Sequence, residues 1–241
     1  QQFQSVDHAK GAADLRTGAI SPQGHGGPDN FGYTWADSDE GQVVFDWTDI
    51  SSTGTNLIFG DDTVSPAVNL GFGFEFYGTE YNQVYVSSNG FLSFESTHNG
   101  CCSGQPLPSA DIYQNLIAWA WKDLHPQGGS VHYQTIGDDF ILQFTGYGEF
   151  GRAGTVTAQV ILSSNGTIKL QYLSFNGFNT SNLSVGIENQ DSSDGLQVVF
   201  NAAYLKDELA IEIATSLPWA SVSQSSGSIL AAASEEIELT F

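Results

Sequence analysis

The sequence predicts an all-β protein, an antiparallel β-sandwich of the jelly-roll kind, and three observations support this prediction. From Phe31 onward, short β-rich runs recur between turn signals. Several runs alternate apolar and polar residues, as in 131–135 and 168–172, which is typical of half-buried strands. No window of 11 residues shows a helical period. Many short strands at regular spacing are characteristic of sandwiches.

The expected strands follow one another along the chain with turn residues between them. The turns are Asn89-Gly90, Asn165-Gly166 and Gly137-Asp138-Asp139, residue types that accept the positive φ of tight hairpins. The strands are predicted at Val43–Ile50, Asn56–Phe59, Val68–Tyr77, Gln83–Ser87, Phe91–Glu95, Leu116–Trp121, Ser130–Ile136, Phe140–Tyr147, Thr155–Leu162, Thr167–Leu173, Leu183–Glu188, Leu196–Phe200 and Leu209–Ile213.

Three regions are expected. Residues 1–30 are rich in Gly, Gln, Ala and Asp without periodicity, which predicts an extended N-terminal arm or linker. The sandwich occupies 31–214. Residues 215–241 hold two or three further strands, expected as part of an immunoglobulin-like unit. Because so few strands cannot bury a core, the tail packs on the sandwich, is completed by another chain, or continues in a longer protein.

Composition excludes some partners. The 241 residues include 27 acidic and 6 basic side chains, a net charge of −21. Such a charge repels nucleic acid and anionic membrane surfaces. The longest apolar run, Leu116–Trp121, is too short to insert into a membrane. The chain begins with Gln1 and contains no methionine, which favours a processed product.

The two cysteines, Cys101 and Cys102, are sequence neighbours between glycines in Asn99-Gly100-Cys101-Cys102-Ser103-Gly104. A disulfide within one chain can therefore only be vicinal, a small ring that stiffens a loop. A trans peptide would hold their Cα atoms about 3.8 Å apart, closer than in ordinary disulfides. This bridge indicates an oxidising, extracellular or cell-surface location. Two reduced thiols are the alternative.

A rigid, exposed loop binds with a low ordering cost, so residues 98–106 are the first choice for a recognition site. Trp119 and Trp121 lie two apart on one predicted strand and should share a face. They form either core or a sugar-stacking platform beside the loop. The candidate ligand-binding residues are Asn99, Cys101, Cys102, Ser103, Gln105, Trp121 and Asp123.

Clustered carboxylates suggest calcium, which takes six to eight oxygen ligands. No EF-hand loop is present. Ordinary turn chemistry is the competing explanation for acidic turns such as Asp138-Asp139 and Asp191 to Asp194. The candidate ligands of a structural calcium ion are Asp37, Asp39, Glu40, Asp61 and Asp62.

Catalytic signatures are missing from the sequence. It contains neither a Gly-x-Ser-x-Gly elbow nor His-Glu-x-x-His. A glycosidase needs two facing carboxylates, and sequence alone cannot pair the available acids, Glu75, Glu80, Glu95, Glu149 and Glu188. We therefore expect a protein that is not an enzyme.

Residues 27–213 resemble a module of large secreted and surface proteins of bacteria, distantly similar to the nidogen-type extracellular domain. The resemblance is carried by these segments: Gly27 to Tyr33, Asp37 to Glu40, Phe45 to Ile50, Leu70 to Phe72, Phe76 to Gly78, Val86 to Phe94, Gly100 to Pro108, Leu116 to Ala118, Trp121 to Leu124, and Gly186 to Asn189. It implies an extracellular accessory module. The tail resembles the opening strands of a BACON-type immunoglobulin-like domain, without the closing strands.

These features predict a secreted, non-catalytic adhesion or recognition module that binds extracellular glycan or a cell-surface polymer. The alternative is a structural subunit that self-associates into a fibre or sheath, exchanging strands through its terminal segments. A third reading is an accessory domain of a secreted hydrolase.

Overall fold

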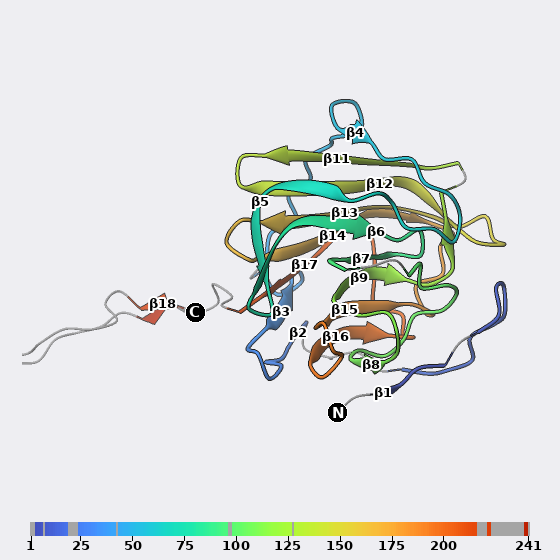
Figure 1. Ribbon diagram of the computed structural model, residues 1–241, viewed down its shortest axis with the longest axis horizontal. Coiled ribbons are helices and arrows are strands. Elements are labelled where there is room, and N and C mark those ends of the chain that lie inside the picture. The colour runs from blue at the N-terminus through green and yellow to red at the C-terminus, as the bar shows by residue number, and fades with distance from the viewer. Residues whose placement is uncertain are drawn as a thin grey trace, which may run out of the picture.

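The computed structural model describes residues 3–6, 8–18, 24–41, 43–95, 98–126, 128–215, 221–222 and 239–240. Every regular element in these residues is a strand, and two antiparallel sheets stack face to face (Figure 1). Within the described ranges there is accordingly no helix of the length and apolarity that a bilayer crossing requires. The predicted sandwich is confirmed.

The larger sheet contains the long central hairpins of the fold. Its order is β2-β3-β17-β14-β13-β12-β11-β4, with β10 also paired to β12. In that order the strands are β2 (His25–Gly26), β3 (Thr34–Asp37), β17 (Leu209–Ala214), β14 (Ile168–Asn176), β13 (Thr155–Ser163), β12 (Asp139–Glu149), β11 (Ser130–Ile136), β4 (Thr55–Asn56) and β10 (Leu124–His125).

The smaller sheet has the order β16-β15-β9-β7-β6-β5. Two further strand pairs lie outside the main sheets: β1 (Phe3–Gln4) runs parallel to β8 (Ser109–Ala110), and β18 (Ser221–Val222) pairs antiparallel with β19 (Leu239–Thr240). The strands of the smaller sheet are β16 (Gly195–Phe200), β15 (Ser184–Glu188), β9 (Leu116–Trp121), β7 (Phe91–Ser93), β6 (Thr79–Val86) and β5 (Val68–Phe76).

The main core fills the space between the two sheets. Trp119 of β9 stacks on Phe144 of β12 with ring centroids 4.2 Å apart, and the Tyr172 side chain reaches the Trp119 carbonyl from β14. These side chains are fully buried. Alternating residues of β12 and β13 contribute to this apolar layer, as the period of the sequence predicts, together with residues of β5, β6, β14, β15 and β17.

Strand prediction succeeds best where alternation is clean. β9 and β11 have the predicted bounds, and the glycines of the three predicted turns, Gly90, Gly137 and Gly166, have φ of +84°, +60° and +88°. The short strands β1, β2, β3, β8 and β10 were not predicted.

The predicted strand Val43–Ile50 is wrong. This segment has no strand pairing; instead it crosses the outer face of the larger sheet, where three glutamines on adjacent strands bind its backbone. Gln171 exchanges two hydrogen bonds with Asp46, of 2.7 and 2.8 Å. Gln159 donates to the Thr48 carbonyl at 2.6 Å, and Gln143 accepts from the Ile50 amide at 3.0 Å. Side-chain amides therefore replace the sheet ladder.

Most of the predicted tail, residues 215–241, lies outside the described residues. The described part is Thr215 with the pair β18 and β19, so the resemblance of the tail to a BACON-type domain stays a prediction. The boundaries of the three predicted regions stay predictions.

Candidate binding site

The vicinal disulfide joins Cys101 and Cys102 across a cis peptide bond, with Cα atoms 3.0 Å apart rather than at the trans spacing. The loop is fixed from both sides. The Cys101 amide donates to Asn99 Oδ1 at 3.0 Å, and Trp121 Nε1 donates to the Gly100 carbonyl at 2.8 Å. A Cβ on Gly100 would lie 2.2 Å from the Phe91 ring, so only glycine fits there.

Trp119 and Trp121 do not share a face, which corrects the sequence prediction. The amides of Trp119 and Ala120 both donate to the Gly90 carbonyl, at 3.1 and 3.0 Å, so two residues of β9 oppose one partner. This β-bulge reverses the alternation. Trp119 packs in the main core, whereas Trp121 packs with Phe91 on the other face and is fully buried. Trp121 supports the loop from beneath and offers no platform to a ligand.

The N-terminal arm lies along the same loop. Val6 and the Gln105 side chain exchange two hydrogen bonds, each of 3.0 Å. Arg16 donates to Gln105 Oε1 at 2.7 Å and to the Gly104 carbonyl at 2.6 Å. Cys102 faces the arm across a small hollow of about 110 Å³. The loop is therefore half-buried, not freely exposed as predicted, and Gln105 binds the arm.

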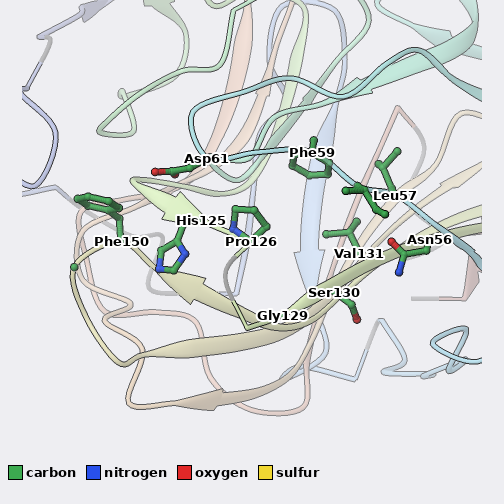
Figure 2. A pocket seen from close by; sticks show the side chains of 12 residues that line it. Asn56, Leu57, Phe59, Asp61, His125, Pro126, Gly129, Ser130, Val131 and Phe150 are labelled. Carbon is green, nitrogen blue, oxygen red and sulfur yellow. The ribbon is translucent and has the colours of Figure 1, made fainter.

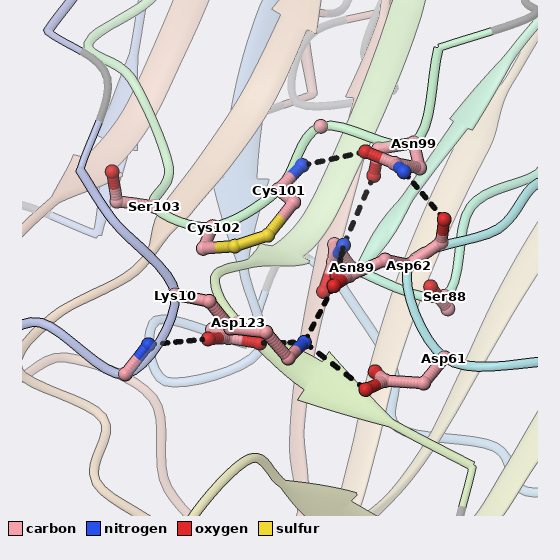
Figure 3. The surroundings of a disulfide bond; sticks show 12 residues. Lys10, Asp61, Asp62, Ser88, Asn89, Asn99, Cys101, Cys102, Ser103 and Asp123 are labelled. Atoms are coloured by element: carbon pink, nitrogen blue, oxygen red, sulfur yellow. Dashed lines mark hydrogen bonds and ion pairs between the residues drawn. A yellow bond between two sulfur atoms is a disulfide. The ribbon is translucent and has the colours of Figure 1, made fainter.

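Lys10 of the arm enters a cage of three carboxylates beside the disulfide (Figure 3). Its Nζ lies 2.6 Å from Asp62 Oδ2, 3.0 Å from Asp61 Oδ2 and 3.3 Å from Asp123 Oδ1. The same ammonium lies 3.9 Å from the centroid of the Phe150 ring, within cation–π range. The structure thus unites predicted metal ligands, Asp61 and Asp62, with the predicted ligand contact Asp123.

Neighbouring amides hold the cage in position. Asn89, fully buried, donates to Asp62 Oδ1 at 3.0 Å and accepts from the Leu124 amide at 3.0 Å. Asn99 donates to the Asp62 carbonyl in a short hydrogen bond. Asp62 has φ +49°, a left-handed conformation that aspartate tolerates better than most residues. Asn89 therefore supports the cage as well as its turn, a role that the hairpin motif did not reveal.

The contacts within the cage change the pKa values of Asp123 and Lys10. Burial raises the pKa of Asp123 despite the opposing effect of the Gly11 amide and Lys10. Burial by itself would lower the pKa of Lys10, but the hydrogen bonds to Asp62 and Asp61 outweigh it, and the pKa is raised. Lys10 is consequently charged throughout the physiological range.

Three of the predicted calcium ligands, Asp37, Asp39 and Glu40, bind separate protein partners. Asp37 is buried and accepts hydrogen bonds from the Tyr204 hydroxyl and the Asp39 amide. Asp39 pairs with Lys206 at 2.7 Å, and Glu40 lies 3.6 Å from His25. Of the other two predicted calcium ligands, Asp62 belongs to a cluster and Asp61 does not: one oxygen each of Asp62 and Asp123 and the sulfurs of Cys101 and Cys102 all lie within 4.8 Å of one another.

A groove of about 590 Å³ adjoins the cage (Figure 2). Asp61 and Phe150 lie at one end of it, and Leu57 and Asn56 at the other. Ile58, in its lining, is 83% exposed. The sequence predicted a strand at Asn56–Phe59, but β4 ends at Asn56 and the following residues line the groove. The exposure of Ile58 is a tertiary property, so the sequence pattern offered no signal for the groove.

Ser103 and Lys122 lie behind the loop. Ser103 is 8% exposed, and its hydroxyl has no hydrogen-bond partner among the residues that the structure describes. Lys122 is buried and pairs with Glu149, and it also donates to Asn182 at 2.7 Å. Burial lowers the pKa of Lys122 although Glu149 opposes the shift. Because the ammonium is surrounded by protein acceptors, we interpret this pair as a support of the site.

Two stacked antiparallel sheets with a loop-built surface site define a modular β-sandwich domain. The profile of the NIDO-related family matches residues 39–225, most of the sequence, and the chain belongs to this family. This membership confirms the expected nidogen-like module and supports an extracellular, β-rich domain. No curated protein and no solved structure matches the chain.

Proposed function

We propose that the domain is a secreted, non-catalytic recognition or adhesion module, and that it binds an extracellular glycan or surface polymer. The observation that carries the proposal is the continuous face made by the groove and the cage, which share Asp61 and Phe150. Family membership supports the extracellular setting.

The groove has the physical character of a polymer-binding surface. It is lined by apolar and aromatic side chains, including Phe59 and Phe150, with polar groups such as Asn56 and His125 among them. Aromatic faces stack on sugar rings while a few polar groups set orientation. The strands and the tied loop fix this face in advance, which lowers the ordering cost of binding.

A glycan array with wild type and Ile58→Asp tests the groove. Ile58 is largely exposed, so the substitution leaves the core intact while placing a carboxylate in the groove. Val44→Asp is the matched control, because Val44 is also exposed, at 67%, and does not line the groove. We expect binding by wild type and Val44→Asp and at least a tenfold loss for Ile58→Asp. Negligible binding by wild type contradicts the glycan proposal.

The dicysteine loop is tested on the same array with Cys101→Ser/Cys102→Ser. Because the loop positions Asn99 against Asp62, we expect this variant to bind more weakly than wild type. Equal binding by both proteins would exclude a role for the bridge in recognition.

Assembly by strand exchange is the second candidate, favoured by one observation. β1 of the arm adds to β8 as an extra parallel strand, and main-chain pairing of this kind can equally be made by another chain. Size-exclusion chromatography and electron microscopy distinguish the two. Concentration-dependent oligomers that dissociate when residues 1–18 are deleted support exchange, and a monomer at all concentrations contradicts it.

A further inference from the structure

We propose that the cage of Asp61, Asp62, Asp123 and Phe150 is a receptor for a lysine side chain of a partner protein, and that Lys10 is its intramolecular occupant. This inference rests on the proposed function as a recognition module and names a ligand class for one end of its binding face.

The cage has the chemistry of an ammonium site. A lysine ammonium has three N–H donors and a strongly hydrated charge, and three carboxylates lie 2.6–3.3 Å from it here. The ring of Phe150 at 3.9 Å adds a cation–π face, which favours an organic cation over a hard metal ion.

The cage carries more negative charge than its occupant neutralises. Three carboxylates surround a single ammonium, which leaves a formal charge of −2 when all are ionised. The protein itself is strongly acidic and has only six basic residues, so this excess is not balanced elsewhere in the chain. A basic partner is therefore electrostatically complementary to the site.

The surrounding contacts select a peptide rather than an isolated amine. The amide of Gly11, which follows the lysine, donates to Asp123 Oδ2 at 3.1 Å. Farther along the arm, Gln105 pairs with the Val6 backbone and β8 pairs with β1. The site thus contacts main-chain groups of the arm as well as one ammonium, which a turn at Lys10 and Gly11 presents: the Ala12 amide donates to the Ala9 carbonyl at 2.9 Å, and Gly11 has φ +73°. Strand addition is limited to β1.

The Lys10 side chain is accessible to solvent, and several apolar residues of the arm that carries it are not buried. The Lys10 side chain is 30% exposed, and Asp61, 40% exposed, opens the cage to the neighbouring groove. The apolar arm residues Leu15 and Val6 are 86% and 46% exposed. Few buried apolar contacts and solvent-exposed ion pairs characterise segments that open locally at low cost, so a competing lysine can displace Lys10.

The test is a binding measurement with the 241-residue chain and a peptide of residues 5–16, labelled with fluorescein. Lys10→Ala/Arg16→Ala removes both cationic anchors of the intramolecular arm. Lys169→Ala/Lys206→Ala is the matched control, because these lysines pair with Glu212 and Asp39 outside the cage. We expect the first variant to bind the peptide at least tenfold more tightly than wild type, and the control to behave as wild type.

A second peptide with Nε-acetyl-lysine isolates the ammonium. We expect acetylation of the lysine to weaken peptide binding at least tenfold. When Asp62→Asn/Asp123→Asn is combined with Lys10→Ala/Arg16→Ala, we expect the acetylated and unmodified peptides to bind equally. If the alanine variant does not fold, Lys10→Met/Arg16→Met keeps the length of both side chains without their charge. No binding by the folded variant, or equal binding of both peptides, overturns the proposal.

Calcium chloride and a glucosamine oligomer are the competing probes. Binding of calcium to the double variant without binding of the peptide would make the cage a metal site and overturn the proposal. Binding of the glucosamine oligomer without binding of the peptide would make the cage a saccharide site and would also overturn the proposal. If the peptide does not bind, but wild type binds glycans on the array and Ile58→Asp abolishes that binding, this inference is refuted while the proposed function is supported.

Discussion

Two irregular segments cross the surface of this sandwich, and they are held by opposite means. Residues 43–50 lie on the larger sheet, where the buried amides of Gln143, Gln159 and Gln171 bind their backbone. The described arm, residues 3–6 and 8–18, lies beside the dicysteine loop. It is held by part-buried hydrogen bonds to Gln105 and by the ion pairs of Lys10 with the cage carboxylates.

The difference separates a structural segment from a displaceable one. A buried amide network costs a large desolvation penalty when it is opened, because every donor and acceptor in it loses its partner. Ion pairs at an exposed surface exchange with water and salt at small cost. We therefore expect 43–50 to open only with global unfolding and the arm to open by itself.

The largest expected effect comes from breaking the amide network. Gln159→Ala removes the donor to the Thr48 carbonyl and to Gln143 Oε1, and it removes the acceptor of Gln171. Gln143 Oε1 then keeps the Ile50 amide, and the chain of glutamine side chains beneath the segment is interrupted. We expect a loss of about 3 kcal/mol in the free energy of unfolding, measured by chemical denaturation. Gln134→Ala is the control, because Gln134 accepts only an exposed hydrogen bond from Thr53. A loss below about 1 kcal/mol would show that the segment is not fixed by this network.

The next effect concerns the anchor of β8, the strand on which the arm pairs. Glu188 is fully buried, and it accepts hydrogen bonds from the Ser109 amide and the Ser192 hydroxyl. Burial raises the pKa of Glu188 to about 8, although these hydrogen bonds oppose the shift. Because the folded state holds the proton more tightly than the unfolded state, this contribution is complete below about pH 4 and is lost as the pH rises through 8.

We expect the free energy of unfolding to fall by roughly 2–3 kcal/mol between pH 5 and pH 8 on account of Glu188. Glu188→Gln keeps a neutral hydrogen-bonding group and should flatten this slope, as followed by urea denaturation at each pH. The same slope in both proteins would assign the pH dependence to other groups.

A smaller, local effect is expected at the cage. Lys10→Ala should accelerate amide hydrogen exchange in the described arm about tenfold while residues 43–50 stay protected, with a change below about 1 kcal/mol in global stability. Lys206→Ala, which removes another exposed lysine from its carboxylate partner, is the control. Equal acceleration in both segments would mean that arm and body open together.

The smallest expected effect is acid release of the arm. Burial by itself would raise the pKa of Asp14, but hydrogen bonds from Arg16 and Asn201 lower it to about 2. The stabilisation is therefore present above about pH 4 and is lost as the pH falls toward 2, a change of about 1 kcal/mol after solvent screening. Hydrogen exchange of the arm, corrected for intrinsic rates, should rise about fivefold over this window. Asp14→Asn should remove that dependence, and an unchanged dependence would refute the role of Asp14.

Local patterns were enough to predict the sandwich, most of its strands and the position of the vicinal bridge. Alternation is a local property, because neighbouring side chains of a strand point to opposite sheet faces, so β9 and β11 could be read without coordinates. The adjacency of Cys101 and Cys102 was likewise visible in the chain. Asp61, Asp62 and Asp123 were identified as site residues, but by two unrelated arguments.

Which of these residues meet depends on contacts between segments that lie far apart along the chain. Lys10 lies 52 residues from Asp62 and 113 from Asp123, and no local pattern encodes a contact between them. The bulge that separates Trp119 from Trp121 depends on the Gly90 carbonyl. The backbone of 43–50 satisfies its hydrogen bonds with glutamines of other strands, although its apolar run favoured a strand. In each case a distant partner outweighed a local preference, because burial and hydrogen bonding act across space rather than along the chain.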